Sequence, residues 1–346
     1  MKSEAKTVVL VSPAMAESNN GNWHTAHRWA QFLSGYCDIA LLPQWPSPQV
    51  TRVEPQAMVA LHARRSAESI QAWAKAWPGK PLIVVLTGTD LYRDIHFDAD
   101  ARQSLALASR LVVLQDAGLA ALPDAWRAKA RVIYQSAPAL KPACKPVHRF
   151  GVLMVGHLRD EKDPLTFMRA AAHGFAAGIH FDQIGEALAP RFAVQARATA
   201  QRLPHYRWLG GLPRAQTRQR IKRAHLLVNC SLMEGGAQVI MEAVQSCTPV
   251  LASRISGNIG MLGTGYAGYF APGDDAGLAA LVRRCAAEPA FLDLLQGQCA
   301  ERAPLFGPQT EKRLVINLLA CAAGSPGGLP HDHLALPASL SSLPCP

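Results

Sequence analysis

The stretch NCSLMEGGAQVIME, residues 229–242, decides the fold of this chain. An apolar run of strand length, Ala224–Val228, precedes it, and residues 238–247 have the spacing of a helix. A Thr-Pro pair ends that helix, and residues 250–253 have the composition of another strand. The order strand, glycine loop, helix, strand predicts a βαβ unit. Its loop lies at the carboxyl end of the first strand, where open parallel sheets bind their ligands.

The chemistry of this loop favours a nucleotide-sugar as its ligand. Gly235 and Gly236 let the backbone approach a ligand closely, and the start of the following helix offers free N–H groups to a phosphate. Glu234 and Glu242 flank this phosphate-binding loop, and carboxylates accept hydrogen bonds from sugar hydroxyls. A phosphate-binding loop between two carboxylates would suit a nucleotide-sugar, with its diphosphate in the middle and its sugar and ribose on either side. In the alternative interpretation, Glu242 is a solvated helix residue and the glycines only turn the chain.

Length and composition indicate a globular protein with two domains. The chain has 346 residues, of which 49% are hydrophobic and 17% charged, and its net charge of +10 suggests anionic partners. The eight cysteines include no CxxC pair, which favours reduced thiols in a cytoplasmic protein. No apolar run reaches membrane-spanning length, so we expect no stable membrane association. The short run Val8–Val11 is interpreted as a first strand, not as part of a signal peptide.

Strands and helices alternate along the chain, which predicts an α/β protein with two doubly wound parallel sheets. Strands are predicted at residues 7–11, 37–42, 58–62, 82–86, 110–114, 130–134, 150–155, 180–184, 206–209, 224–228, 250–253 and 268–270. Helices are predicted at residues 23–34, 66–77, 163–177, 190–203, 213–223, 238–247, 276–288 and 309–322. The proline-containing segment 141–146 is interpreted as a linker, which predicts domains at 1–145 and 146–308 with a ligand cleft between them. Residues 324–346 are expected to form a disordered tail.

A second motif follows the strand at residues 150–155. Gly156 allows a tight turn, and Arg159 and Lys162 are spaced closely enough to converge on one anion just before a helix begins. On its own, such a pair is also compatible with a solvated charge cluster. The glycine loop later in the same predicted domain favours the anion-binding interpretation.

The predicted first domain has two polar loops at strand ends. Residues 20–29, NGNWHTAHRW, combine one glycine with several hydrogen-bond donors and a cation. Residues 87–90, TGTD, follow an apolar strand. His24 and His27 could form a metal-binding pair, but no third ligand is evident, so we predict no metal site. His27 could equally be a helix residue that packs against the sheet.

These motifs together resemble the retaining GT-B glycosyltransferases known as group 4. The spacing of Glu234 and Glu242 is similar to the signature of that family, whose first glutamate faces the donor sugar and whose second holds the ribose. Its G-x-x-R…K segment clamps the donor diphosphate without a metal, and Gly156, Arg159 and Lys162 match it. The resemblance implies a GT-B fold whose last helix packs back on the first domain. It also implies a UDP-sugar as co-substrate and no required cofactor.

The resemblance also implies which residues do the chemistry. TGTD is similar to the HG-x-D strand end of the family, with Thr87 where histidine is usual. The catalytic residues that the resemblance implies are Asp90, Arg159, Lys162 and Glu234. The donor-binding residues that it implies are Gly21, Gly156, Arg159, Lys162, Gly185, Glu234, Gly235, Gly236, Ala237, Gln238 and Glu242.

Within group 4, the sequence resembles one smaller group of enzymes in particular. The NGNWHTAHRW loop, LTGTDLYRD, VGHLRDEKDP and SLMEGGAQVIMEAV are similar to the selenosugar synthases of selenoneine biosynthesis, over about residues 7–320. That resemblance implies transfer of a sugar from UDP-N-acetylglucosamine or UDP-glucose to selenophosphate, which gives a 1-selenosugar. A small anionic acceptor needs a basic pocket. The candidate acceptor-binding residues are Asn22, His24, Thr25, His27, Arg28, Arg64, Thr87, Gly88, Thr89 and Arg93.

Two other functions are compatible with the sequence. A glycosyltransferase that acts on a hydroxyl of a sugar, lipid or natural product would share the donor site and differ at the acceptor loop. A non-catalytic binder of UDP-sugar or nucleic acid is disfavoured, because both glutamates and the Arg/Lys pair are present and no nucleic-acid motif is. The five basic residues of the helix at 213–223 are interpreted as a solvated face, with attraction to a membrane surface as the lesser alternative.

Overall fold

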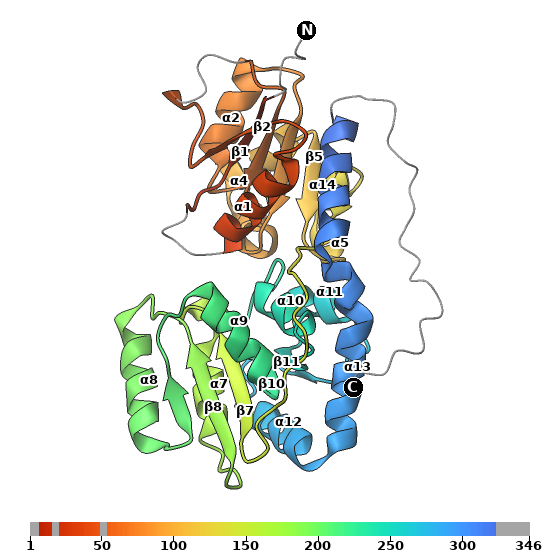
Figure 1. Cartoon of the computed structure of the whole chain (residues 1–346). Helices are drawn as coiled ribbons and strands as arrows, with labels where there is room; N and C mark the ends of the chain where they lie inside the picture. The colour runs from red at the N-terminus through yellow and green to blue at the C-terminus, as the bar shows by residue number, and fades with distance from the viewer. Residues whose placement is uncertain (1–6, 16–20, 49–53, 323–346) are drawn as a thin grey trace.

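The computed structural model describes residues 7–15, 21–48 and 54–322. Each half of the molecule contains a six-stranded parallel sheet with helices on both faces (Figure 1). The strand order is β2-β1-β3-β4-β5-β6 in the first sheet and β12-β11-β10-β7-β8-β9 in the second. The prediction of two doubly wound parallel sheets is therefore confirmed.

The strands lie where the apolar runs predict them. The first sheet contains β1 (Thr7–Val11), β2 (Asp38–Leu42), β3 (Ala57–Leu61), β4 (Leu82–Leu86), β5 (Arg110–Val113) and β6 (Ala130–Val132). The second contains β7 (Phe150–Val155), β8 (Ile179–Ile184), β9 (Tyr206–Trp208), β10 (Leu226–Asn229), β11 (Val250–Ser253) and β12 (Tyr269–Phe270). Strands β3, β4 and β10 are buried along their whole length, because helices cover both faces of a parallel sheet.

Helices connect most successive strands of the described chain, and the last three helices follow the last strand. They are α1 (Gly21–Leu33), α2 (Ala67–Ala76), α3 (Ile95–Phe97), α4 (Ala99–Leu107), α5 (Ala117–Ala121), α6 (Asp124–Arg127), α7 (Pro164–Ala171), α8 (Pro190–Arg202), α9 (Arg214–Arg223), α10 (Gln238–Val244), α11 (Ser256–Leu262), α12 (Asp275–Ala287), α13 (Pro289–Arg302) and α14 (Pro308–Ala322). Asp98, Asp163 and Asp274 cap α4, α7 and α12, because each carboxylate accepts a backbone N–H of the first turn. None of the described helices is both long and apolar enough to cross a membrane.

Several short elements differ from the sequence prediction. The segment after β4 forms a π-helical turn, η3 (Asp90–Asp94), and then α3 and α4, where no helix was predicted. Helices α5, α6, α11 and α13 were also not predicted, and α7 ends at Ala171 instead of near residue 177. Two further turns are 3-10 helices, η4 (Asp160–Lys162) and η5 (Ala303–Phe306). The predicted tail at 324–346 and the predicted loop residue Asn20 lie outside the described residues.

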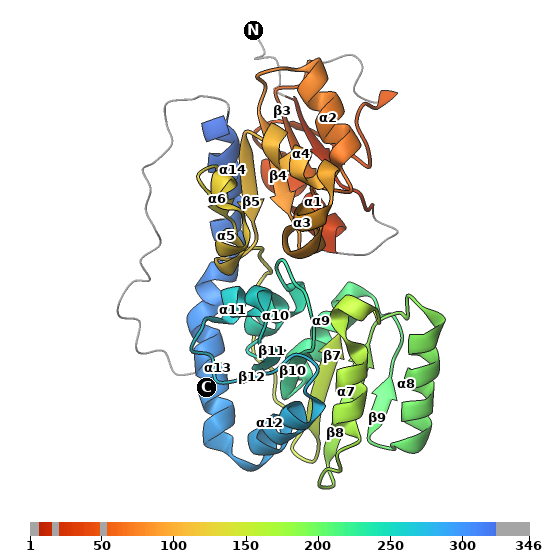
Figure 2. The ribbon, with the colours of Figure 1, turned by 180° about the vertical axis from the view of Figure 1, so that it is seen from behind.

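The last helix joins the two halves of the molecule. Figure 2 shows α13 beside the second sheet and α14 beside the first, in one continuous column. Val315 and Leu318 of α14 are buried with Trp29 of α1 in the core on one face of the first sheet. The predicted domain boundaries at residues 145 and 308 stay predictions, and both fall outside the strands of the two sheets.

A buried carboxylate fixes α14 to the first domain. Glu311 has no exposed surface and accepts hydrogen bonds from Arg28 Nε at 2.6 Å, Arg28 Nη2 at 2.9 Å and Trp29 Nε1 at 2.7 Å. The Ser136 hydroxyl donates a further hydrogen bond to it. A buried carboxylate is stable only when it is paired and hydrogen-bonded, so these contacts hold α1, α14 and the segment after β6 in one arrangement.

We expect Arg28→Ala to lower the free energy of unfolding by about 3 kcal/mol, because the buried Glu311 carboxylate loses its counter-ion. Denaturation in urea measures this change. The control is Arg313→Ala, because Arg313 lies on the same helix as Glu311 and its side chain is exposed. We expect this variant to leave the free energy of unfolding within about 0.5 kcal/mol of the wild type. Equal stability of the two variants would contradict the anchoring role of Glu311.

Candidate functional site

The two domains meet backbone to backbone at their glycine loops. The loop after β10 contains Gly235, and a Cβ atom placed there would lie 2.3 Å from the carbonyl oxygen of Thr87, at the end of β4. A Cβ atom on Gly88 would lie 2.9 Å from the backbone nitrogen of Gly235, and Gly88 has a φ of +138° that other residues rarely adopt. Both glycines are therefore required for this contact. The carboxyl ends of β4 and β10 lie side by side as a result.

This contact gives the glycine loop a role that the sequence did not predict. Gly235 and Gly236 were expected to let the backbone approach a ligand. That expectation stays a prediction, and the structure adds that the first domain packs beside both glycines, since a Cβ atom on Gly236 would lie 2.9 Å from Cβ of Leu114. The following helix α10 begins at Gln238, whose Nε2 donates a hydrogen bond of 3.2 Å to the carbonyl oxygen of Gly21 in the first domain. Thus the glycine loop joins the domains as well as bordering the candidate site.

Glu234 is held at this junction by three polar partners. Its Oε1 accepts hydrogen bonds from Lys162 Nζ, from Ser231 Oγ at 2.7 Å and from Asn229 Nδ2 at 3.4 Å. The side chain is almost fully buried. Burial alone would raise the pKa of this carboxyl, but the Lys162 ammonium and the three hydrogen bonds together lower it. Glu234 is therefore an ionised carboxylate that Lys162 neutralises.

The predicted anion clamp lies beside Glu234. Arg159 directly precedes η4 and Lys162 is its last residue, so both cationic side chains extend from the same turn of the chain. The Arg159 side chain is 40% exposed and its Nε lies 3.8 Å from Oε2 of Glu161. Gly156 has a φ of +153° and lies under the aliphatic part of Lys162. Gly185, whose predicted contact with the donor stays a prediction, packs on the backbone of Gly156, because its Cβ position is 1.9 Å from that carbonyl oxygen.

Glu242 is buried on α10 and faces an arginine. Its Oε1 accepts hydrogen bonds from Nε and Nη2 of Arg214 at 3.2 and 3.1 Å. The alternative interpretation of Glu242 as a solvated helix residue is therefore wrong. His24 of the first domain is close enough to sense the same arginine: burial and then the charge of Arg214 lower its pKa to about 4. His24 is thus neutral at physiological pH and lies at the junction.

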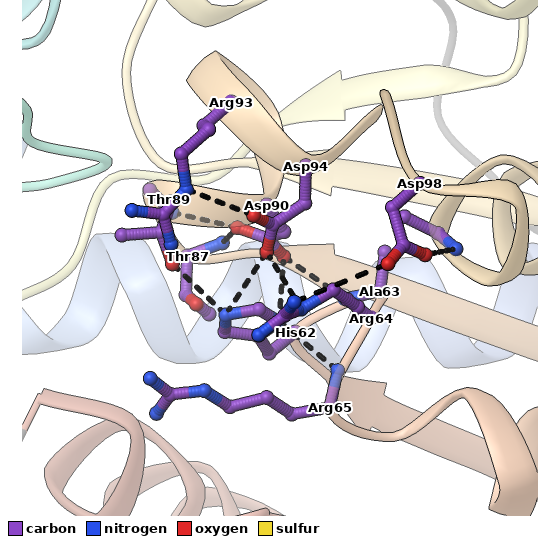
Figure 3. A network of polar contacts seen from close by, with 12 residues as sticks. His62, Ala63, Arg64, Arg65, Thr87, Thr89, Asp90, Arg93, Asp94 and Asp98 are labelled. Carbon is purple, nitrogen blue, oxygen red and sulfur yellow. Dashed lines mark hydrogen bonds and ion pairs between the residues drawn. The ribbon is translucent and has the colours of Figure 1, made fainter. Parts of the chain in front are cut away.

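Asp90 organises the strand ends of the first domain. Figure 3 shows its carboxylate between the ends of β3 and β4. Its Oδ1 accepts the backbone N–H groups of Thr87, Gly88 and Leu91 at 2.9, 2.8 and 3.1 Å, and its Oδ2 accepts that of Ala63 at 2.9 Å. Asp90 has no exposed surface. Asp90 therefore holds two loops in place, and its predicted catalytic role stays a prediction.

A histidine that the sequence analysis did not single out lies in the same network. His62 follows β3 with a φ of +71°, and its Nε2 lies 3.0 Å from Oγ1 of Thr89 (Figure 3). Its Nδ1 accepts the backbone N–H of Arg65, so the proton of the neutral ring is on Nε2. Burial lowers the pKa of His62, partly opposed by the nearby carboxylate of Asp90. Its position after a buried strand was the one available signal.

Two predicted acceptor-binding arginines lie at the edge of this network. Arg93 Nε donates to Oδ1 of Asp94 at 3.0 Å, and Arg64 Nε lies 3.3 Å from Oδ2 of the same carboxylate. Both arginine side chains are about half exposed, at 45% and 47%. Arg93 also reaches the second domain, because its Nη1 lies 3.6 Å from Oε1 of Glu161. Arg93 therefore faces the side of the junction that carries the predicted anion clamp.

Three other predicted acceptor residues have different partners. Arg28 bonds Glu311, and Thr25 is buried with its hydroxyl donating to the carbonyl of Gly21 at 2.8 Å and accepting from Gln135. His27 is exposed on α1, where it stacks on Trp23 with ring centroids 5.0 Å apart. These contacts assign Arg28 and Thr25 a structural role and place His27 on the outer surface. Asn22 and His24 lie in the first turns of α1, next to the junction.

Comparison with solved structures identifies the fold. The structure resembles HepE of Anabaena in complex with UDP and glucose, with a TM-score of 0.72, 17% identity, and coverage of 91% of this chain and 100% of that one. The fold is GT-B. Sucrose-phosphate synthase of Thermosynechococcus elongatus is similar to the same extent, with a TM-score of 0.73, 16% identity and the same coverage. At these identities, the GT-B likeness is a likeness of fold.

Sequence comparison points to the second domain. Residues 149–288 match the family model described as glycosyl transferases group 1, and they contain Arg159, Lys162, Glu234 and Glu242. Glycosyltransferase 1 domain-containing protein 1 of Xenopus tropicalis is 34% identical over 109 residues, which are 31% of each chain. The match thus spans about a third of the length of that curated relative.

We expect Gly235→Ala to separate the glycine loops, because the added Cβ atom has no space beside the Thr87 carbonyl. Small-angle X-ray scattering should then give a larger radius of gyration than for the wild type. Gly265→Ala is the matched control, since its Cβ atom would meet nothing within 4 Å and its φ is not positive. Identical scattering of Gly235→Ala and the wild type would show that the backbone contact does not hold the domains together.

Proposed function

We propose that this protein is a glycosyltransferase that takes a sugar from a UDP-sugar bound at the junction of its two domains. The observation that carries the proposal is the cluster of Arg159, Lys162 and Glu234 at the strand ends of the second domain, directly opposite the loop after β4. The family match over residues 149–288 supports it, because that match covers all three residues. Solved structures of HepE with UDP and with UDP-glucose, on the same fold, support UDP-sugar as the donor class.

The roles follow from charge and position. Arg159 and Lys162 neutralise the diphosphate as negative charge develops on the leaving UDP, which is the usual way in which fixed cations lower such a barrier. Glu234 pairs with Lys162 and so fixes the position of this cation. Glu234 accepts hydrogen bonds from the hydroxyl groups of the donor sugar. Glu242 accepts them from the ribose after the Arg214 side chain moves away from it. Because two cations serve the diphosphate, the reaction is expected to run without a metal ion.

The acceptor in this proposal is a small anion, and we take it to be selenophosphate because the loops at residues 20–29 and 87–90 resemble those of the selenosugar synthases. Arg93 and Arg64 are half exposed, and the Thr89 hydroxyl accepts from His62, which leaves its own proton free to be donated. Selenium of selenophosphate forms a bond to the anomeric carbon while the bond from that carbon to UDP breaks. The product then carries a selenium–phosphorus bond, and its hydrolysis by water gives the 1-selenosugar and phosphate.

Mass spectrometry of the products tests this function. The purified protein is incubated with UDP-N-acetylglucosamine or UDP-glucose and fresh selenophosphate, in the presence of a chelator. We expect UDP and the mass of a selenosugar or its phosphorylated precursor. Release of UDP only with hydroxyl-bearing acceptors would replace selenophosphate by such an acceptor. Absence of UDP release with either class would contradict the proposed enzyme.

Removal of either clamp cation should abolish most turnover while the protein stays folded. We expect Lys162→Ala and Arg159→Ala each to lower kcat by roughly 100-fold, since oriented charge at a developing anion contributes about 3 kcal/mol. A UDP-release assay measures this. Arg191→Ala is the control, because Arg191 is an exposed arginine whose partner is Asp160. Near-normal turnover in either clamp variant would contradict the assignment.

A further inference from the structure

One carboxylate bridges the two domains beside the proposed site. Glu161 lies between Arg159 and Lys162 in η4, and its carbonyl oxygen accepts the backbone N–H of Leu232 at 2.9 Å. Its side chain lies near one arginine of each domain: Oε1 is 3.6 Å from Nη1 of Arg93, and Oε2 is 3.8 Å from Nε of Arg159. The Glu161 carboxylate is thus a shared counter-ion of two arginines, Arg159 of the diphosphate clamp and Arg93 of the acceptor side.

Glu161 is held more loosely than the other carboxylates at the junction. Glu234 accepts three hydrogen bonds, and Asp90 accepts four backbone N–H groups. Asp94 accepts a hydrogen bond of 3.0 Å from Arg93. Both contacts of the Glu161 side chain exceed hydrogen-bond length, and 27% of that side chain is exposed. An ion pair at this distance, without a hydrogen bond, can be replaced at little cost.

We propose that Glu161 is an internal anion that occupies the place of an anionic substrate between Arg93 and Arg159 and must be displaced when that substrate binds. This proposal rests on the proposed function, because it takes Arg159 as part of the diphosphate clamp and Arg93 as a ligand of the acceptor. A phosphate-like group carries more charge than a carboxylate and bonds arginine in the same forked geometry, so it displaces Glu161. A neutral acceptor cannot replace the negative charge of Glu161 beside these arginines. Glu161 then stays paired with them and blocks the acceptor position.

Glu161 therefore sets the charge selectivity of the acceptor side. It pairs with one arginine from each domain and so links the domains at the junction. Binding of the UDP diphosphate to Arg159 removes one of its two partners. The carboxylate is then paired with Arg93 alone, and an anionic acceptor replaces it there.

Calorimetric titration with inorganic phosphate tests the proposal. The protein is first saturated with UDP, so that phosphate is not bound by the clamp. We expect Glu161→Gln to bind phosphate about fivefold more tightly than the wild type, which is the effect of removing one competing ion pair. Asp160→Asn is the matched control: it makes the same charge change one residue away, but Asp160 is exposed and pairs with Arg191. Its phosphate affinity should stay within twofold of the wild type.

The outcomes are distinct. Arg93→Ala combined with Glu161→Gln should lose the gain, because the gain is made at Arg93. An unchanged affinity in Glu161→Gln, an equal gain in Asp160→Asn, or a gain that survives Arg93→Ala would each overturn the proposal. Glu161→Ala provides a second variant should the glutamine variant not fold. If UDP does not bind the wild type, the proposed donor site fails, and the same comparison without UDP still decides the role of Glu161.

Discussion

The arrangement of this protein depends on a contact between two backbones. Gly88 and Gly235 leave no room for a side chain, so the loop after β4 and the loop after β10 touch directly. Because parallel strands all end at one edge of their sheet, this single contact brings the polar strand ends of both domains together. The Asp90 carboxylate shapes one loop through backbone N–H groups, and the Lys162–Glu234 pair shapes the other. Function can therefore be built from residues that neither domain holds alone.

Several cations at this junction are paired with carboxylates. Lys162 faces Glu234, Arg214 faces Glu242, and Arg93 is shared by Asp94 and Glu161. Such pairing keeps the cations ordered, and it lowers the cost of holding several of them close together. In the proposed function, phosphate groups and sugar hydroxyls replace some of these contacts, and Glu161 is the carboxylate whose contacts are longest, at 3.6 and 3.8 Å.

The sequence predicted the sheets well because buried parallel strands are nearly continuous apolar runs, as in β4, LIVVL. Helix α11 was missed since it contains two glycines, and α13 because a proline interrupts the pattern at residue 289. The charged donor-side residues were predicted from their spacing within one domain and from the family resemblance, and their roles stay predictions. Contacts distant in sequence could not be found in that way: Arg28 bonds a glutamate 283 positions away, and the place of His62 depends on the neighbouring strand.

Hydrogen exchange of backbone amides, with and without UDP-sugar, tests most directly whether both domains form one site. Ligand binding slows exchange where backbone groups are covered or ordered. We predict slower exchange in the turn at residues 156–163 and the loop at 229–238, and also across the junction at residues 87–94 of the first domain. Protection confined to the second domain would contradict a site shared by both domains. Unchanged exchange in all three segments would contradict UDP-sugar binding at this junction.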